Sequence, residues 1–298
     1  MTYSIIARDP DSGQMGVATQ SQAFAVGSSV AWAEAGSGVV ATQSMGEPMY
    51  GQLGLDGLRA GLTAEEALTA LRSVDPHPQR RQVGMVDGTG MIAVYTGDAC
   101  VAEAGHVVGD GCAALANLVR SARVWEAMVE AYEGASGWLP GRLVTALQAA
   151  DAAGGDERGR RSAALVVVRA ERSGRPWRDQ LVDLRVDDDP DPVDRLARMV
   201  AHSRRYHLTV EAFELALDGR PDEALARLPG EVAPEDTDPD IALWRAVVLA
   251  AAGRTDDAER TGAELVRRAP AFAEVARRFG PAGLVDQELL DVILPPRA

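Results

Sequence analysis

The sequence contains no lysine, and all 30 of its basic residues are arginine. Arginine stays protonated in proteins, so the chain has no side-chain amine that could act as a general base, form a Schiff base or hold a phosphate in a P-loop. The absence of lysine therefore excludes every mechanism that depends on such an amine. It also indicates a genome rich in G and C.

Cysteine, histidine and long apolar runs are scarce as well. Cys100 and Cys112 are the only cysteines, in no metal-like spacing, so we expect two reduced, mostly buried thiols and no disulfide scaffold. The four histidines show no metal-ligand spacing and the glycines form no nucleotide fingerprint, so we expect neither metal nor cofactor. Without an apolar run of about 18 residues or a basic segment before an apolar one, we expect no membrane span, no signal peptide and a cytoplasmic protein.

The balance of charge is strongly acidic, with a formal net charge of -14. Because binding to phosphate groups needs a basic surface, we do not expect nucleic acids or anionic membranes as partners. Hydrophobic residues make up 46% of the 298 positions. This is enough to bury a sizeable core in one large or two moderate domains.

The most informative residue is Thr2, which follows the initiator Met1 and begins the strand-like run of residues 2–8. A small second residue allows the cell to remove Met1, which would expose a threonine with a free α-amine of pKa about 7.7 to 8.0. That amine can act as general base for the hydroxyl of the same residue, as acyl-transfer enzymes require. The alternative is a strand that happens to begin at the N-terminus.

The hydrophobic pattern predicts alternating groups of strands and helices over the first two thirds of the chain. We expect strands at residues 2–8, 14–20, 28–33, 39–44, 82–86, 91–96, 162–169 and 180–186. We expect helices at residues 49–60, from the capping box at Thr63 to the residue before Pro76, and at residues 112–132 and 140–150. This order predicts an α+β fold, a four-layer αββα sandwich of two antiparallel sheets with helix pairs outside.

The register of the first hairpin brings a second hydroxyl to Thr2. With a short turn between the two strands, Thr2 falls opposite either Thr19 or Ser21, depending on which residues form the turn. The alternative is that these residues are ordinary strand threonines and serines on a half-exposed face.

The acidic, proline-containing segment 187–192 predicts a domain boundary, with one domain at residues 1–189 and a second at residues 190–298. Beyond it, Gly219 and Gly253 lie in related segments 34 residues apart, which is the tetratricopeptide period. We therefore expect a small C-terminal all-α, tetratricopeptide-like domain that packs on the sandwich or on a partner subunit.

Several motifs in the same order resemble the domain of unknown function 1028 family over residues 2 to 192. These motifs are residues 2–9, 25–28, 41–44, 154–160 and 183–186. The resemblance implies a place among the N-terminal nucleophile (Ntn) hydrolases, which share the αββα fold, and supplies no substrate. It also implies a C-terminal extension of the kind described as peptidoglycan-binding. Proteasome-type relatives lower the pKa of the threonine with a lysine, so here an arginine, or the α-amine with hydroxyl and backbone support, must replace it.

The candidate site residues follow from this hypothesis. Thr2 is the nucleophile, nearby hydroxyls orient it, a side-chain amide or backbone amides bind the oxyanion, and an arginine fork anchors a substrate carboxylate. The candidate catalytic residues are Thr2, Thr19, Ser21, Ser44 and Asn117, with Asn117 expected on a helix. The candidate substrate-binding residues are Thr42, Gln43, Asp156, Arg158, Arg160 and Ser162. The alternatives are a solvated loop or interface salt bridges for residues 156–162 and a capping or surface role for Asn117.

The functional prediction is an amidohydrolase that cleaves an amide bond in a small or peptide-like substrate. The alternative is a non-catalytic scaffold whose helical repeats bind a protein, a peptide or a cell-wall fragment, because a fold does not establish an activity. We expect a homo-oligomer, since relatives of this fold commonly assemble.

Overall fold

The computed structural model describes residues 2–230 and 238–294, so Met1 lies outside the described residues. Packing divides the chain into two compact units, Met1–Val200 and Ala201–Ala298. The division falls inside helix α6 (Pro192–Leu217), beyond the predicted boundary after Asp189. Within the described ranges, no helix is both long enough and apolar enough to cross a membrane.

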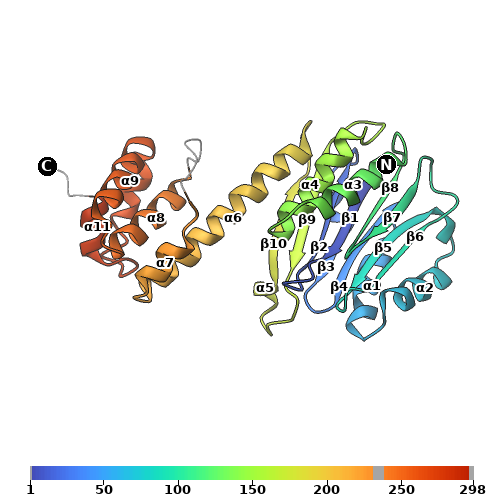
Figure 1. The fold of residues 1–298 in the computed structure, drawn as a ribbon, viewed down its shortest axis with the longest axis horizontal. Helices are drawn as coiled ribbons and strands as arrows, with labels where there is room; N and C mark the ends of the chain where they lie inside the picture. Colours follow the sequence, from blue (N-terminus) through green and yellow to red (C-terminus); the bar gives the residue numbers. More distant parts are fainter. Residues whose placement is uncertain (1, 231–237, 295–298) are drawn as a thin grey trace. The chain divides into compact units, whose positions relative to one another are not determined.

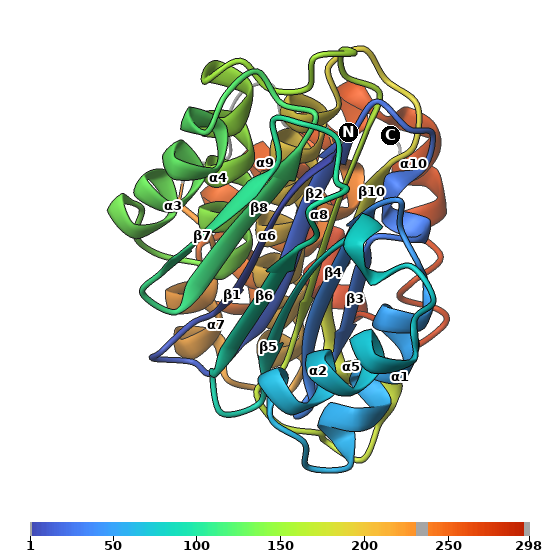
Figure 2. The same cartoon turned by 90° about the vertical axis from the view of Figure 1, so that its right-hand side faces the viewer.

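The first unit is a mixed α+β structure with two antiparallel sheets, as predicted (Figures 1 and 2). Its strands are β1 (Thr2–Arg8), β2 (Met15–Ser21), β3 (Ala31–Glu34), β4 (Gly38–Ser44), β5 (Arg81–Asp87), β6 (Ile92–Thr96), β7 (Gly105–Gly109), β8 (Cys112–Asn117), β9 (Ser162–Val168) and β10 (Gln180–Val186). Among the described residues, a six-stranded sheet has the order β10-β9-β2-β1-β8-β7 and a four-stranded sheet has the order β3-β4-β5-β6. Strand β1 therefore lies in the middle of the larger sheet.

Helices cover the outer faces of the two sheets. The unit contains α1 (Met49–Arg59), α2 (Ala64–Val74), α3 (Arg123–Gly134), α4 (Leu139–Ala152), α5 (Pro176–Asp179) and the first turns of α6, with the short 3-10 helices η1 (Val26–Ser28) and η2 (Pro78–Arg80). Helices α1 and α2 pack on the smaller sheet, and α3 and α4 pack on the larger one. The predicted capping box is present, because the Thr63 hydroxyl accepts from the Glu66 amide and the Glu66 carboxylate accepts from the Thr63 amide.

Alternation along β1 sends its side chains into two different cores. Tyr3 and Ile5 pack against α3 and α4, whereas Ile6 packs between the two sheets with residues such as Val17. Since residues two apart on a strand point to the same face, Thr2 points, like Ile6, toward the space between the sheets.

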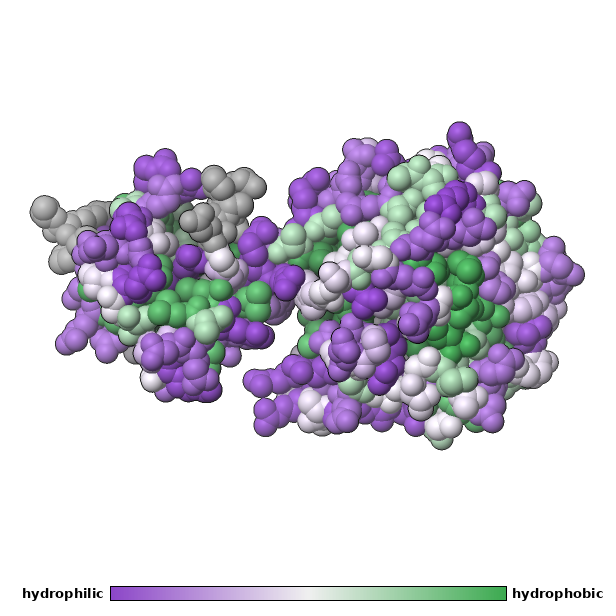
Figure 3. Space-filling model, viewed as in Figure 1, coloured by the Kyte–Doolittle hydropathy of each residue, from purple (hydrophilic) through white to green (hydrophobic). Residues whose placement is uncertain are grey.

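The surface of each unit is not uniformly polar. Figure 3 shows green apolar patches among the purple hydrophilic side chains on both units.

The prediction of a helix at residues 112–132 is wrong in its first part. Residues 112–117 form strand β8, which pairs with β7 in a hairpin with Gly111 at φ 66° in the turn, and α3 begins only at Arg123. Strand β8 is buried along its whole length between β1 and β7. Such a strand reads as a continuous run of small apolar residues, and sheet pairing overrides the helix propensity of its alanines. Within β8, burial raises the pKa of the free Cys112 thiol to about 12.

The second unit is helical. It contains the end of α6 and the helices α7 (Pro221–Arg227), α8 (Pro239–Ala251), α9 (Thr255–Arg268), α10 (Pro270–Ala276) and α11 (Gln287–Ile293). Its core includes Trp244, whose ring stacks on Phe279 with centroids 5.8 Å apart and lies 4.2 Å from the ring of Phe213.

A buried ion pair in the first unit gives a pH-dependent prediction. Asp75 accepts hydrogen bonds from Arg81 Nε at 2.8 Å and from the Tyr50 hydroxyl at 3.0 Å, and the bond from Arg81 lowers the pKa of Asp75 to about 2. Because this pKa lies below the unfolded value of about 3.9, the stabilisation is complete above about pH 5 and is lost as the pH falls toward 2. We expect Asp75→Asn to lower the free energy of unfolding at pH 7 by about 2 kcal/mol. In this variant the free energy of unfolding should also decrease less between pH 5 and pH 2 than it does in the wild type.

Urea denaturation between pH 7 and pH 2 measures this effect. Asp11→Asn, at an exposed position, is the matched control and should leave the wild-type profile unchanged. Parallel profiles for wild type and Asp75→Asn would contradict the prediction.

Candidate functional site

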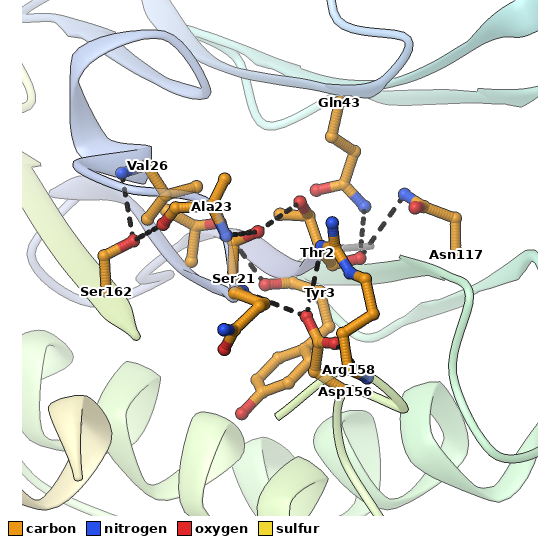
Figure 4. A network of polar contacts seen from close by, with 12 residues as sticks. Thr2, Tyr3, Ser21, Ala23, Val26, Gln43, Asn117, Asp156, Arg158 and Ser162 are labelled. Carbon is orange, nitrogen blue, oxygen red and sulfur yellow. Dashed lines mark hydrogen bonds and ion pairs between the residues drawn. The ribbon is translucent and has the colours of Figure 1, made fainter. Parts of the chain in front are cut away.

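Thr2 lies at the N-terminal end of β1, between Ser21 of β2 and Asn117 of β8. It is 7% exposed, and its Oγ1 donates a hydrogen bond to Ser21 Oγ at 3.1 Å (Figure 4). Of the two predicted registers, the one that pairs Thr2 with Ser21 is confirmed. Thr19 lies opposite Ser4 instead, and its Oγ1 lies 2.8 Å from Ser4 Oγ. The Ser21 hydroxyl is therefore a hydrogen-bond partner of the Thr2 hydroxyl.

A buried glutamine from the other sheet reaches the backbone of Thr2. Gln43 Nε2 lies 3.2 Å from Thr2 O and 3.1 Å from Leu115 O, and Gln43 Oε1 accepts from Ser4 Oγ at 2.6 Å. Gln43 was predicted to bind substrate. In the structure its amide joins β4 to β1 and β8 across the space between the sheets, and it fixes the carbonyl of Thr2.

Asn117 and Gln82 continue this set of amides. Asn117 Nδ2 lies 3.4 Å from Thr2 O and donates to Gln82 Oε1 at 3.0 Å, while Gln82 Nε2 donates to Ala116 O at 2.9 Å. Asn117 thus sits on a buried strand rather than on the predicted helix, with its amide beside Thr2. The sequence reasoning missed Gln82, for which the signal was a polar amide at the head of an otherwise apolar strand.

The predicted hydroxyl of Thr42 lies elsewhere, and Ser44 ends the same strand. Alternation along β4 sends Gln43 toward the other sheet and Thr42 toward the opposite face, where Thr42 Oγ1 donates to Glu47 O at 3.2 Å. The Thr42 hydroxyl is therefore used by the loop after β4 rather than by Thr2. Ser44 is the last residue of β4, lies opposite Arg81 and has a φ of 72°.

Asp156 lies across the N-terminal end of β1. Its carboxylate accepts from Gln22 N at 3.0 Å, just after β2, and its backbone bridges to Val119, just after β8. Because β1 lies between β2 and β8, these contacts place Asp156 beyond the N-terminal end of β1, next to Thr2. The Asp156 side chain is completely buried, and Arg158 Nη2 lies 3.4 Å from Asp156 Oδ2. In Figure 4 the Arg158 side chain extends from Asp156 toward Thr2.

The structure separates Arg160 from Arg158. Arg160 pairs with Asp151 at 3.4 Å and with Asp191 at 3.2 Å, and Asp151 accepts from the Tyr3 hydroxyl at 2.5 Å. Tyr3 points to the face of β1 opposite to Thr2, where burial raises the pKa of the Tyr3 phenol and of the Asp151 carboxyl. Arg160 therefore belongs to an ion-pair network on the helix side of the sheet.

Ser162 shapes the loop that follows Ser21. Its Oγ donates to Ala23 O at 2.6 Å and accepts from Val26 N at 3.1 Å, and Ala23 N in turn donates to Ser21 Oγ at 3.0 Å. Ser162 thus acts on the Thr2 site through the loop between β2 and η1.

Backbone strain is concentrated at the same end of the sheets. Among the described residues, the non-glycine residues with positive φ are Ala25 (52°), Ser44 (72°) and Leu118 (55°). They follow or end β2, β4 and β8, whose C-terminal ends meet at Thr2. Such conformations cost energy and cluster at functional sites, so the strain marks this end as the candidate site. Within residues 2–230 and 238–294, no group of three or more His, Cys, Asp or Glu side chains is placed to hold a metal ion.

The fold and site define a mixed α+β protein with a buried threonine hydroxyl at the head of a central strand. The chain belongs to a family of unknown function (DUF1028), whose model matches residues 2–196. This confirms the resemblance seen in the sequence. The crystal structure of protein SPO2555 from Silicibacter pomeroyi, assigned to the same family model, is similar, with a TM-score of 0.61 and 30% identity over 68% of this chain and 88% of that chain. None of the curated proteins matches the chain.

Proposed function

We propose that the protein is an amidohydrolase of the Ntn type. Once the peptide bond between Met1 and Thr2 has been cleaved, Thr2 is the nucleophile. One observation carries the proposal: Thr2 Oγ1 lies at the head of the central strand, 3.1 Å from Ser21 Oγ, among fixed amide, carboxylate and guanidinium groups. Two antiparallel sheets with helices on their outer faces support the interpretation as an Ntn-hydrolase-like αββα sandwich.

The proposed reaction uses the α-amine as the base. It takes the hydroxyl proton while Thr2 Oγ1 forms a bond to the substrate carbonyl carbon, and the tetrahedral intermediate then collapses as the C–N bond breaks. The Thr2 ammonium gives the proton to the departing amine. Water attacks the acyl-threonine ester with the α-amine again as base, the ester C–O bond breaks, and Thr2 Oγ1 recovers a proton.

The surrounding residues have separate roles in this proposal. Ser21 orients the hydroxyl, and the amides of Gln43 and Asn117 hold the Thr2 carbonyl, so that the residue enters the reaction already positioned. In this proposal Asp156, which bridges the ends of the strands beside β1, accepts a hydrogen bond from the freed α-amine. Arg158 supplies the positive charge that a lysine would otherwise give, and as a fixed cation it anchors a substrate carboxylate.

Mass spectrometry of the untagged protein tests the proposal in two steps. The intact mass should show that Met1 is lost, and a β-lactone should then add once, as an ester on Thr2 located by tandem mass spectrometry. Retention of Met1 in most molecules, or adducts spread over other residues, would count against the mechanism.

For the second unit we propose a tetratricopeptide-like structure that binds a protein, a peptide or a cell-wall fragment. The two sequence repeats have matching geometry, which supports this. Gly219 and Gly253 occupy turns at φ 73° and 72°, and Ala224 and Ala258, five residues further on, are both fully buried in the following helix. Pro270 then begins α10, directly after α9.

A further inference from the structure

We infer that the substrate cleaved at Thr2 carries a large apolar group, held by three exposed apolar side chains whose loops lie at the end of the sheets where β1 begins. We call this set the apolar rim. It consists of Phe24, Met45 and Val101, which are 62%, 60% and 55% exposed. The inference rests on the proposed hydrolase function and names the substrate class of that site.

Phe24 lies in the loop after β2. Its neighbour Ala23 is tied to the site, since Ala23 N donates to Ser21 Oγ at 3.0 Å and Ala23 O accepts from Ser162 at 2.6 Å. The Phe24 ring lies 5.3 Å from the Arg161 guanidinium, and Arg161 N donates to Ser21 O at 3.2 Å. Phe24 thus lies three positions after Ser21, the hydroxyl partner of Thr2.

Met45 and Val101 come from the other walls of the same end. Met45 follows the last residue of β4, two positions after Gln43, and its carbonyl accepts from Arg81 at 2.5 Å. Val101 O accepts from Leu118 N at 3.1 Å, and the preceding residue, Cys100, donates from its sulfur to Arg81 O at 3.3 Å. The loop that carries Val101 therefore bridges the end of β8 and the start of β5.

Each rim residue is next to a strained one. Phe24 precedes Ala25, Met45 follows Ser44, and Val101 is hydrogen-bonded to Leu118. A single exposed apolar side chain needs no explanation, but three at one strained end of the fold do. A ligand that covers these side chains is bound more tightly, because removing apolar surface from water is favourable.

The positive charge at this end indicates a second feature of the substrate, a carboxylate. Arg158, whose side chain is 43% exposed, lies beside Asp156 at the head of β1. An apolar group on the rim and a carboxylate at Arg158 describe an amphipathic amide, such as an acylated amino acid or a short peptide with a hydrophobic residue. Very polar amides, such as those of sugars, lack the group that the rim would cover.

A series of β-lactones with methyl, propyl and hexyl groups tests the inference on the full chain from which Met1 has been removed. The rate of Thr2 ester formation is followed by intact mass and divided by the rate at which each lactone hydrolyses in buffer. Full burial of one methylene is worth about fourfold. With partial burial on an open rim, we expect the hexyl compound to react at least about tenfold faster than the methyl compound.

Variants test whether the rim residues cause the preference for the longer alkyl chain. In the double variant Phe24→Ser with Met45→Ser, we expect the hexyl-to-methyl ratio to fall to within about twofold of unity, while the methyl compound still labels Thr2. Met91→Ser is the matched control, because Met91 is 62% exposed but lies in the turn at the opposite end of β5. It should keep the wild-type ratio.

Three results would overturn the inference. They are labelling of Thr2 that does not depend on chain length, an equal loss of preference in Met91→Ser, and a double variant that changes only the oligomeric state seen by size-exclusion chromatography. A complete absence of Thr2 adducts with every lactone would instead refute the hydrolase proposal on which the inference rests.

Discussion

Replacement of Thr2 by alanine is expected to abolish the β-lactone adduct and to lower amide hydrolysis by about 10⁴-fold or more, because it removes the attacking oxygen. Thr2→Ser keeps both the hydroxyl and the α-amine and should retain labelling within about tenfold of wild type. The measurement is the rate of adduct formation by intact mass, with the N-terminal residue of each variant verified in the same experiment.

The structure provides a control for folding in this comparison. The Thr2 hydroxyl bonds to Ser21 Oγ, while the strand itself is held by backbone pairs with β2 and β8 and by Gln43. We therefore expect Thr2→Ala to cost only about 1 kcal/mol of stability. A folded Thr2→Ala protein that still forms the same single adduct would show that another residue is the nucleophile.

Replacement of Gln43 by alanine is expected to cause the largest loss of stability, about 3 kcal/mol or more. The side chain is 1% exposed, and its removal takes one hydrogen-bond partner from each of Thr2 O, Leu115 O and the Ser4 hydroxyl and leaves a cavity. For a unit of this size, such a loss corresponds to a fall of about 10 °C in the melting temperature. Thermal unfolding followed by circular dichroism measures it.

The control for this variant is Gln52→Ala, on the exposed face of α1, which should change stability by less than about 0.5 kcal/mol. A shift for Gln43→Ala as small as that of the control would mean that the amide set does not hold the sheets together. Lactone labelling of Gln43→Ala should also slow, because the Thr2 carbonyl loses one of the two side-chain amides beside it.

Local sequence signals predicted much of the fold. The first hairpin, the capping box at Thr63 and the helices that border Gly61 and Pro140 rest on contacts between neighbours in the chain, so short-range patterns suffice to find them. Strand β8 was predicted to be helical because its alanines favour helices, whereas it forms a strand by pairing with its neighbour β7 and with β1, far away in the sequence. An alanine-rich run carries no local mark of that pairing.

The candidate site shows the same limit. Hydroxyls close to Thr2 were predicted, but Thr42 faces away and Arg160 serves the opposite face of the sheet. Gln82 was not foreseen at all. Each of these outcomes depends on which face of a strand meets which neighbour, and a shift of one residue reverses it.

By itself the sequence determined that no lysine takes part in the chemistry of the site, that Thr2 begins an apolar strand, and that a hydroxyl lies opposite Thr2. These properties follow from composition and from the two-residue period of a strand. Only the tertiary structure decided that the hydroxyl is that of Ser21, that amides from the other sheet hold the Thr2 carbonyl, and that Asp156 spans the end of β1. Those contacts join residues far apart in the chain, so they exist only after the two sheets have packed together.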